Sequence, residues 1–320
     1  MIISKTPLRI SLFGGGTDFP EYFNKKKSTI IGTTINKYIY ITFSRTLRFD
    51  NNNIKIFYKN NEFVNNVKKL KHNVVKKILI KERITNDLDL HIVADLPSYS
   101  GLGTSSAFTV GLMNLLKSVR KINISEHQLA KECINFERNI LGETVGFQDQ
   151  IHAAYGGFNK IEIYKKNIKV TSLDFNKKKL EKNLFLVFTG LTRKADDIEK
   201  KKIKRIKINF KYLDKINEIS EFAYKLLKKN KIDEVGKLLA ETWELKKKLI
   251  GGLSNKTIDD LYEKGISAGA SGGKLLGAGA GGFLLFYVES KYKKLFLSKM
   301  KKNKVVDFEF SLEGSKIINI

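Results

Sequence analysis

Apolar and polar positions in the first half of the chain predict strands and helices that alternate. Apolar residues occupy every second position of 88–94, which is the period of a strand. Residues 33–43 are rich in the β-branched and aromatic side chains that strands prefer. Residues 9–13 predict a further strand that ends at a glycine turn, and residues 104–119 predict an apolar helix. This alternation indicates a mixed α and β domain.

Helical periodicity dominates the second half. Residues 184–189 and 283–288 predict strands, and amphipathic helices follow the first of them. A lysine-rich, poorly periodic stretch at 165–183 separates the halves, so we expect two domains, residues 1–180 and 181–320. The apolar stripes of the two helices comprise Ile216, Ile219, Phe222, Ala223, Leu226 and Leu227, then Ile232, Val235, Leu238, Leu239, Thr242 and Leu245.

The charge of the chain departs from that of an average globular protein. Lys and Arg number 59 against 33 Asp and Glu, which gives a net charge of +26. Such a charge is typical of proteins that bind nucleic acid or anionic membranes, and also of chains with a lysine-rich composition bias. Because the lysines are dispersed and few aromatic residues lie among them, we favour the second interpretation. We therefore expect no specific nucleic-acid partner.

Several further features bear on where the protein works. No apolar run is long enough to cross a bilayer, and the N-terminus lacks the pattern of a secretory signal. One cysteine, Cys133, excludes an internal disulfide and fits a reducing cytoplasm. The four histidines lie far apart, without zinc-site spacing. We expect a cytoplasmic protein with no membrane partner, and the sequence leaves the oligomeric state open, with a homodimer as one candidate.

A loop rich in glycine and hydroxyl groups, PSYSGLGTSSAF, lies between a predicted strand and a predicted helix at 97–108. Its glycines would let backbone N–H groups approach an anion, and the helix N-terminus adds partial positive charge. Thr104, Ser105 and Ser106 would place hydroxyls near phosphate oxygens or a metal. No lysine follows the last glycine, so the loop is not a Walker A motif. A plain strand-to-helix turn with a serine cap would give the same pattern.

Glu137 is the most informative single residue. It lies on a helix that Ser125 opens, with Gln128 in the capping-box position. At about 100° per residue it points into the middle of the apolar face of that helix. A buried carboxylate needs a partner, which a bound cation or a structural ion pair would each supply. The apolar face comprises Leu129, Ala130, Cys133, Ile134, Phe136, Ile140 and Leu141.

Three other segments carry weaker signals. Asp149, in GFQDQ, follows two glycines and would ordinarily be a turn or cap residue. FGGGTD at 13–18 allows a tight turn, but it lacks the third spaced glycine of a dinucleotide-binding fingerprint. SGGKLLGAGAGGFLLF at 271–286 places glycines before and within a strand, which indicates a close backbone approach or a tight crossover against a helix.

Taken together and in this order, TPLRISLFGGGTD, PSYSGLGTSSAF and KLLGAGAGGF resemble the three motifs of the GHMP kinases. The resemblance covers nearly the whole chain. It implies an α+β fold with an N-terminal ATP-binding domain like ribosomal protein S5 domain 2, and a ferredoxin-like C-terminal domain. The nucleotide would lie between the two domains. The resemblance also implies phosphoryl transfer from ATP with Mg²⁺.

The resemblance assigns roles to the motif residues. Ser105 matches the magnesium-ligand serine, and Glu137 matches the second magnesium ligand. Asp149 matches the catalytic aspartate, and Arg9 would steady it as an anion. The third-motif glycines Gly277, Gly279, Gly281 and Gly282 would shape the floor of the site. The residues expected to bind ATP are Pro97, Ser100, Gly101, Leu102, Gly103, Thr104, Ser105 and Ser106.

The first motif points to the sugar-kinase branch. Galactokinase-like enzymes combine an arginine at the position of Arg9 with an aspartate at that of Asp18, and Gly15, Gly16 and Thr17 belong to the same expected sugar-binding segment. The triple glycine and GFQDQ look closest to D-glycero-D-manno-heptose 7-phosphate kinases and bacterial fucokinase-like proteins. The implied reaction is phosphorylation of an anomeric hydroxyl, of the heptose 7-phosphate or alternatively of another sugar.

A substrate that already carries a phosphate would need a second basic site. Arg193 and Lys194 are the candidates from the sequence, at the expected start of a helix, although a solvated helix start would look the same. Two competing hypotheses remain. A basic nucleic-acid-binding protein with the same two domain types would explain the charge but not Glu137 or FGGGTD. A GHMP-fold protein without turnover is disfavoured by the retained Ser105, Glu137 and Asp149.

Overall fold

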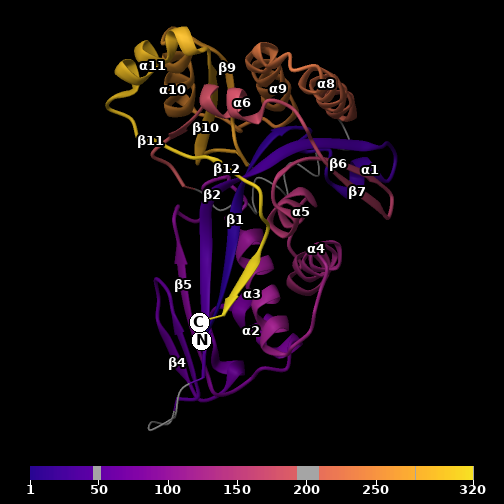
Figure 1. The fold of residues 1–320 in the computed structure, drawn as a ribbon, viewed down its shortest axis with the longest axis vertical. Coiled ribbons are helices and arrows are strands. Elements are labelled where there is room, and N and C mark those ends of the chain that lie inside the picture. The colour runs from indigo at the N-terminus through magenta and orange to yellow at the C-terminus, as the bar shows by residue number, and fades with distance from the viewer. Residues whose placement is uncertain (46–51, 193–208, 278, 320) are drawn as a thin grey trace.

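The computed structural model describes residues 1–45, 52–192, 209–277 and 279–319. Within these residues the strands form a nine-stranded sheet and a four-stranded sheet, which lie at opposite ends of the molecule (Figure 1). The strands of the larger sheet are β1 (Ile2–Phe13), β2 (Ser28–Ser44), β3 (Ile54–Phe57), β4 (Glu62–Val64), β5 (Leu88–Ala94), β6 (Phe158–Tyr164), β7 (Asn167–Ser172), β12 (Phe310–Ser311) and β13 (Lys316–Asn319).

The two longest strands, β1 and β2, form the centre of the larger sheet. They are antiparallel, with Ile10 opposite Thr33, and β2 pairs on its other side first with β6 and then with β5. The three strands expected in this half are thus confirmed, although β1 begins at Ile2 rather than at residue 9. The helical elements of this half are α1 (Pro20–Phe23), η1 (Val67–Lys69), α2 (Asn73–Lys81), α3 (Thr104–Val119), α4 (Glu126–Asn135), the π-helical η2 (Phe136–Leu141) and α5 (Gln148–Tyr155).

Helices α3 and α5 pack against β1 and β2, so the loops before them meet the carboxyl end of β1. The predicted capping box is confirmed: the Ser125 hydroxyl accepts a hydrogen bond from the backbone N–H of Gln128, whose side chain accepts one from the backbone N–H of Ser125. Helix α4 then continues directly into η2, which carries Glu137. The fold therefore brings β1, the N-terminus of α3, η2 and α5 together.

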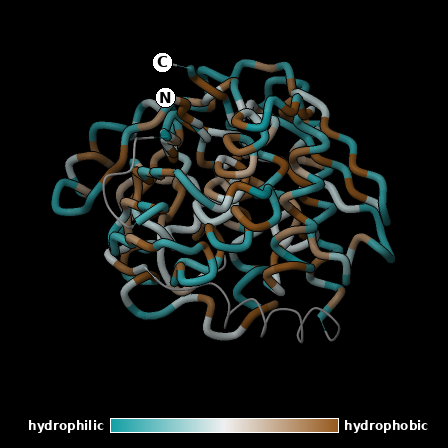
Figure 2. The backbone as a smooth tube through the Cα atoms, turned by 90° about the horizontal axis from the view of Figure 1, so that it is seen from below, coloured by the Kyte–Doolittle hydropathy of each residue, from teal (hydrophilic) through white to brown (hydrophobic). Residues whose placement is uncertain are grey.

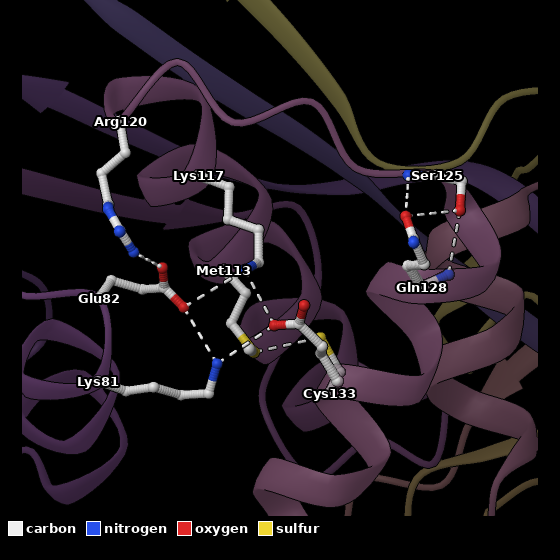
Figure 3. Close-up of polar contacts among 9 residues, drawn as sticks. Lys81, Glu82, Met113, Lys117, Arg120, Ser125, Gln128 and Cys133 are labelled. Carbon is white, nitrogen blue, oxygen red and sulfur yellow. Dashed lines mark hydrogen bonds and ion pairs between the residues drawn. The ribbon is translucent and has the colours of Figure 1, made fainter.

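An ion-pair network ties α2, α3 and α4 to one another (Figure 3). Glu82, at the end of α2, is almost fully buried and lies 3.0 Å from Arg120 at the end of α3. Lys117 of α3 lies 2.9 Å from Glu132 of α4, and Lys81 bridges Glu82 and Glu132 at 3.1 and 3.2 Å. Buried charges that are mutually paired fix a geometry more than they add stability. In α2 and α3 the network lies at the ends opposite to those that line the cavity described below.

The smaller sheet has the ferredoxin-like topology that the resemblance implied. Its strands, taken in chain order, lie in the spatial order 4-1-3-2, all antiparallel. They are β8 (Leu184–Phe188), β9 (Ala270–Leu275), β10 (Phe283–Val288) and β11 (Val305–Val306). The accompanying helices are α6 (Lys177–Asn183), α8 (Phe210–Lys228), η3 (Ile232–Glu234), α9 (Val235–Leu249), α10 (Lys256–Ser267), η4 (Ser290–Tyr292) and α11 (Lys293–Met300).

The amphipathic stripes expected on α8 and α9 are buried, with one exception. Phe222 of α8 is 52% exposed, because it lies at the edge of the apolar stripe, next to the side of the helix that faces solvent. Seen from below, hydrophobic and hydrophilic colours alternate over short distances along the chain, as they do when each element buries one face (Figure 2). No helix in the described ranges combines the length and the apolar character that a membrane span requires.

The end of the chain returns to the first sheet. β12 pairs with β2, and β13 pairs with β1, with Asn319 opposite Ile2, so the two termini lie side by side (Figure 1). The last strands of the segment 181–320 thus pair with the sheet of the first half. β13 covers the backbone groups of Ile2–Lys5, which would otherwise be an unpaired edge of β1.

Candidate active site

A cavity of about 500 Å³ opens where the two domains meet. Its wall combines β1, α3 and α5 of the first domain with α9 and β9 of the second. Most of the residues predicted from the motifs line it, namely Arg9, Gly15, Gly16, Asp18, Gly101, Gly103, Thr104, Ser105, Ser106, Asp149 and Gly277. Pro97, Thr17, Ser100, Leu102, Glu137, Gly279 and Gly281 are not part of that wall.

Arg9 and Asp149 form a two-pronged ion pair in the cavity wall. Arg9 Nε donates to Asp149 Oδ1 at 2.9 Å, and Nη2 donates to Oδ2 at 2.8 Å. The third guanidinium nitrogen donates to the Gly101 carbonyl oxygen at 2.5 Å, so one arginine fixes both the aspartate and the glycine loop. The Asp149 side chain is 26% exposed. A bidentate pair of this kind holds the carboxylate in one orientation toward the cavity.

Gly103 makes this arrangement possible. Its φ is +73°, and a Cβ there would lie 3.1 Å from Arg9 Cγ and 3.4 Å from Asp149 Oδ2. The residue caps α3, whose first-turn N–H groups follow directly. Thr104 and Ser106 are buried in that turn, while Ser105 is exposed to the cavity. The arrangement is an anion-binding helix N-terminus with the Arg9–Asp149 pair beside it.

The third glycine motif supports this loop from below. A Cβ on Gly277 would lie 2.4 Å from Gly101 Cα, and one on Gly282 would lie 2.3 Å from the Ser100 carbonyl oxygen. Backbone therefore packs directly on backbone at these positions. Gly279 and Gly281, expected at the floor of the site, instead pack against Leu253 and Leu191. Their absence of side chains serves the packing of the loop rather than the cavity wall.

Glu137 is fully buried, as its place on the apolar face predicted. Its Oε2 accepts hydrogen bonds from Ser106 Oγ at 2.9 Å and from the Gln150 side chain, whereas Oε1 has no hydrogen-bond partner among the described residues. Burial raises the pKa of Glu137 to about 7. The alternative of a structural ion pair with Lys or Arg is not observed within the described part of the chain. The serine that bonds to Glu137 is Ser106, and Ser105, the expected magnesium ligand, makes no hydrogen bond to Glu137 in the described structure.

Asp18 is held in the cavity wall by neutral donors. Its Oδ1 accepts from the Gly16 N–H at 2.8 Å, and its Oδ2 accepts from Gln148 Nε2 at 3.0 Å. Gly146 allows this approach, because a Cβ there would collide with Asp18 Oδ2. The carboxylate is therefore rigid and faces the cavity beside the triple-glycine turn. Such an acceptor is suited to hydroxyl groups of a ligand.

His152 lies behind the Arg9–Asp149 pair and was not singled out from the sequence. It is fully buried in α5, and neither ring nitrogen has a hydrogen-bond partner among the described residues. Burial, and then the nearby Arg9 charge, lower the pKa of His152 to about 3. The ring is therefore neutral at ordinary pH and fills space beside the site, with its edge close to Gly32.

Part of the cavity is lined by aromatic and aliphatic side chains of the first domain. The rings of Tyr58 and His72 meet edge to face, with their centroids 5.1 Å apart. The centroid of the His72 ring lies 5.4 Å from that of Phe108 of α3. Val74, Ile92 and Ala94 complete this apolar wall. No sequence motif predicts this wall, because its residues come from separate strands and helices. Flat apolar surfaces of this kind accept the rings of a ligand.

Two lysines of the second domain line the opposite wall. Lys246 comes from α9 and Lys274 from β9, and both are buried. They were missed from the sequence, since both lie within otherwise ordinary helix and strand patterns in a lysine-rich chain. Arg193 and Lys194, the basic residues proposed from the sequence, lie outside the described residues.

Comparisons with known proteins agree with this geometry. The family model for the GHMP kinases N terminal domain matches residues 65–157, and that for the GHMP kinases C terminal domain matches residues 223–304. The chain is 33% identical over 335 aligned positions to D-glycero-alpha-D-manno-heptose 7-phosphate kinase of Campylobacter jejuni, covering 98% of each chain. It is 28% identical to the bifunctional fucokinase/GDP-fucose pyrophosphorylase of Arabidopsis thaliana, over 67% of this chain and 21% of that protein.

A solved structure gives the same result. The crystal structure of a D-glycero-D-manno-heptose 1-phosphate kinase from Bacteroides thetaiotaomicron matches with a TM-score of 0.82 and 25% identity, over 100% of this chain and 99% of that one. The family matches, the near full-length relative and the shared fold all agree. The chain therefore belongs to the GHMP kinases, and it is a sugar kinase of that family, an ATP-dependent phosphotransferase.

Proposed function

We propose that this protein transfers the γ-phosphoryl group of ATP to the anomeric hydroxyl of D-glycero-D-manno-heptose 7-phosphate, to give the 1,7-bisphosphate. The observation that carries the proposal is the Arg9–Asp149 pair, which faces the cavity between the helix N-terminus of α3 and the Asp18 turn. The name of one relative, D-glycero-alpha-D-manno-heptose 7-phosphate kinase, supports this choice of acceptor, whereas the structure named a heptose 1-phosphate kinase supports a heptose phosphate without the position.

In this proposal the nucleotide occupies the first-domain side of the cavity. The adenine ring lies against Tyr58, His72 and Phe108, and the phosphates lie on the loop from Ser100 to Gly103 and on the first turn of α3. The backbone N–H groups there would neutralise phosphate charge without having to reorganise. Positioning and charge neutralisation are the main sources of rate in phosphoryl transfer.

The acceptor sugar would lie between Asp18 and Asp149. Asp18 accepts hydrogen bonds from sugar hydroxyls, while Asp149 accepts the proton of the attacking hydroxyl or orients that hydroxyl toward the γ-phosphorus. Arg9 holds Asp149 in its orientation through two hydrogen bonds, and its guanidinium also fixes the glycine loop through the Gly101 carbonyl oxygen. The same arginine thus couples the position of the acceptor group to that of the phosphates.

The residues of the chain fit a Mg²⁺ ion. Glu137 offers a buried oxygen, Oε1, that has no hydrogen-bond partner among the described residues, although the nearby Thr109 hydroxyl acts to lower the pKa of Glu137, and the hydroxyls of Ser105 and Ser106 lie at the start of α3. No cluster of three or more His, Cys, Asp or Glu side chains capable of holding a metal is found in the described ranges. This is the pattern expected when one carboxylate and the nucleotide phosphates share the ion. When bound, Mg²⁺ would neutralise charge on the β- and γ-phosphates.

The test is an acceptor screen. The protein is incubated with Mg·ATP and, separately, with heptose 7-phosphate, heptose 1-phosphate, free heptose and fucose, and products are read by ³¹P NMR. We expect the highest kcat/KM for heptose 7-phosphate, with the new phosphate on C1. A preference for fucose would leave a sugar kinase with another acceptor, and transfer to a different carbon would overturn the anomeric assignment.

A further inference from the structure

The two buried lysines of the second domain lie beside the triple-glycine turn. Lys246 is 8% exposed and Lys274 is fully buried, although both contribute to the cavity wall. Lys274 Nζ donates to the Leu12 carbonyl oxygen at 2.6 Å. It forms no ion pair with an acidic side chain in the described portion of the chain. A buried ammonium group that has only a carbonyl for a partner is costly, and an anion would offset that cost.

Three polar side-chain atoms surround the position that a side chain at residue 15 would occupy. A Cβ at Gly15 would lie 3.3 Å from Ser11 Oγ, 3.5 Å from Lys246 Nζ and 3.6 Å from Gln148 Nε2. Ser11 Oγ is buried, lines the cavity, and has no hydrogen-bond partner within the described residues. A hydroxyl, an ammonium and an amide are therefore aimed at one space that only a glycine leaves open.

The electrostatics of this wall favour an anion. Burial lowers the pKa of Lys274, and the charges of Lys246 and Arg9 lower it further, so the three cations are close enough to interact. Arg9 is already paired with Asp149, and Asp18 is engaged by Gly16 and Gln148. A phosphate dianion placed near Lys246 and Lys274 would relieve the mutual repulsion of the cations.

We propose that Lys246, Lys274 and Ser11 form a subsite for a phosphate group that the acceptor sugar already carries. The subsite lies next to the Gly15–Asp18 segment, and it is distinct from the loop of Ser100 to Gly103 where ATP phosphates would lie. This inference rests on the proposed function and names the feature that selects a phosphorylated sugar. It also replaces Arg193 and Lys194 as the basic residues for that role.

The experiment compares two acceptors that differ only in the phosphate, heptose 7-phosphate and free heptose. Binding is measured by calorimetry without ATP, and KM and kcat are measured with Mg·ATP. Lys246→Met should raise Kd and KM for the phosphorylated sugar about 10- to 100-fold, since it removes a charged hydrogen bond. Values for free heptose and for ATP should change little. Lys246→Arg should recover part of the loss.

Neighbouring variants act as controls. Lys247, the next residue of α9, points outward and pairs with Glu244 at 2.7 Å, so Lys247→Met should leave all of these constants unchanged. Gly15→Ala, which fills the shared space, should mimic Lys246→Met without removing a charge. Ser11→Ala should weaken binding of the phosphorylated sugar by a smaller factor.

The proposed subsite is refuted if Lys246→Met weakens the binding of both acceptors equally. It is also refuted if the change weakens only the binding of ATP, or if it has no more effect than Lys247→Met. If wild-type protein prefers the free sugar, the subsite is refuted while the sugar-kinase activity stands. If no sugar is phosphorylated at all, the proposed function fails, and calorimetry with heptose 7-phosphate still decides the subsite. In that case the subsite would be refuted if Lys246→Met did not weaken the binding of heptose 7-phosphate.

Discussion

Two carboxylates of the candidate site, those of Asp149 and Glu137, have opposite surroundings. Asp149 lies in the cavity wall with its side chain 26% exposed, and both of its oxygens are bonded by Arg9. Glu137 is fully buried one layer deeper, beside Ser106, and one of its oxygens has no donor in the described structure. Among the described residues, the chain supplies a counter-charge for Asp149 but none for Glu137.

This difference in surroundings indicates a different role for each of the two carboxylates. A carboxylate whose partner is covalently part of the chain keeps one charge and one orientation, as a catalytic acceptor requires. A carboxylate buried without a cation is strained when ionised, and that strain is relieved when a cation binds. We therefore propose that Asp149 acts on the acceptor hydroxyl and that Glu137 binds Mg²⁺.

Removing the charge of Asp149 should have the largest effect. Asp149→Asn keeps the shape of the side chain but loses the ion pair and the proton acceptor, so kcat should fall about 10²- to 10⁴-fold. The Kd of ATP should change by much less, because the α3 N-terminus is intact. Turnover close to wild type, in a variant whose melting temperature is unchanged, would remove Asp149 from the mechanism.

The ionisation of Glu137 should be visible as a pH dependence of stability without Mg²⁺. Its pKa in the folded protein is about 7, above its ordinary value of 4.5, so its contribution to the free energy of unfolding is complete below pH 4.5 and is lost as pH rises through 7. The loss amounts to about 3 kcal/mol. Denaturant unfolding at pH 5 and pH 8 should show it in wild type and not in Glu137→Gln, whereas identical pH profiles would contradict it.

The next-largest effect should be on the Mg²⁺ concentration that activity requires. Glu137→Gln should raise the Mg²⁺ concentration for half-maximal activity at least about tenfold, because ligands and their supporting groups typically carry that much metal affinity. Glu143→Gln is the control, since Glu143 is a nearby acidic residue that lines the cavity, whereas Glu137 lies behind the wall, and this change should leave the requirement nearly unchanged. A fall in melting temperature with no change in the Mg²⁺ requirement would make Glu137 a structural residue.

Much of this contrast could be predicted from the sequence. Helical periodicity placed Glu137 on an apolar face, and the burial that follows from it is local to one helix. The pairing of Arg9 with Asp149 came from the family resemblance, because 140 residues separate the two side chains and no local pattern connects them. The same holds for Lys246 and Lys274, which the packing of α9 and β9 against β1 brings to the cavity.

Two other differences have equally physical causes. The sequence did not predict that Ser106 bonds to Glu137: neighbouring residues of a helix point about 100° apart, and the start of α3 turns Ser106 toward η2, while Ser105 as a magnesium ligand stays a prediction. The return of β13 to β1 could not be read from the last residues, since a four-residue strand has little periodicity of its own. Long periodic elements were predictable, whereas choices between adjacent side chains needed the packed structure.

The serines offer the smallest and finest comparison. Ser106→Ala removes a hydrogen bond to Glu137 worth about 1 kcal/mol, so it should raise the Mg²⁺ requirement severalfold. Ser105→Ala leaves the Glu137 contact intact and serves as its neighbour control. If Ser105→Ala has the larger effect, the original motif assignment is right and Ser106 only positions the carboxylate.

The claim that Glu137 is completed by a metal ion is tested most directly by locating that ion. Crystals of the protein with Mn²⁺ and a non-hydrolysable ATP analogue would show the metal by its anomalous scattering. The account predicts an anomalous peak within bonding distance of Glu137 Oε1, next to the nucleotide phosphates and the first turn of α3. A peak held only by phosphates and water, with Glu137 Oε1 bonded to a protein donor instead, would contradict it.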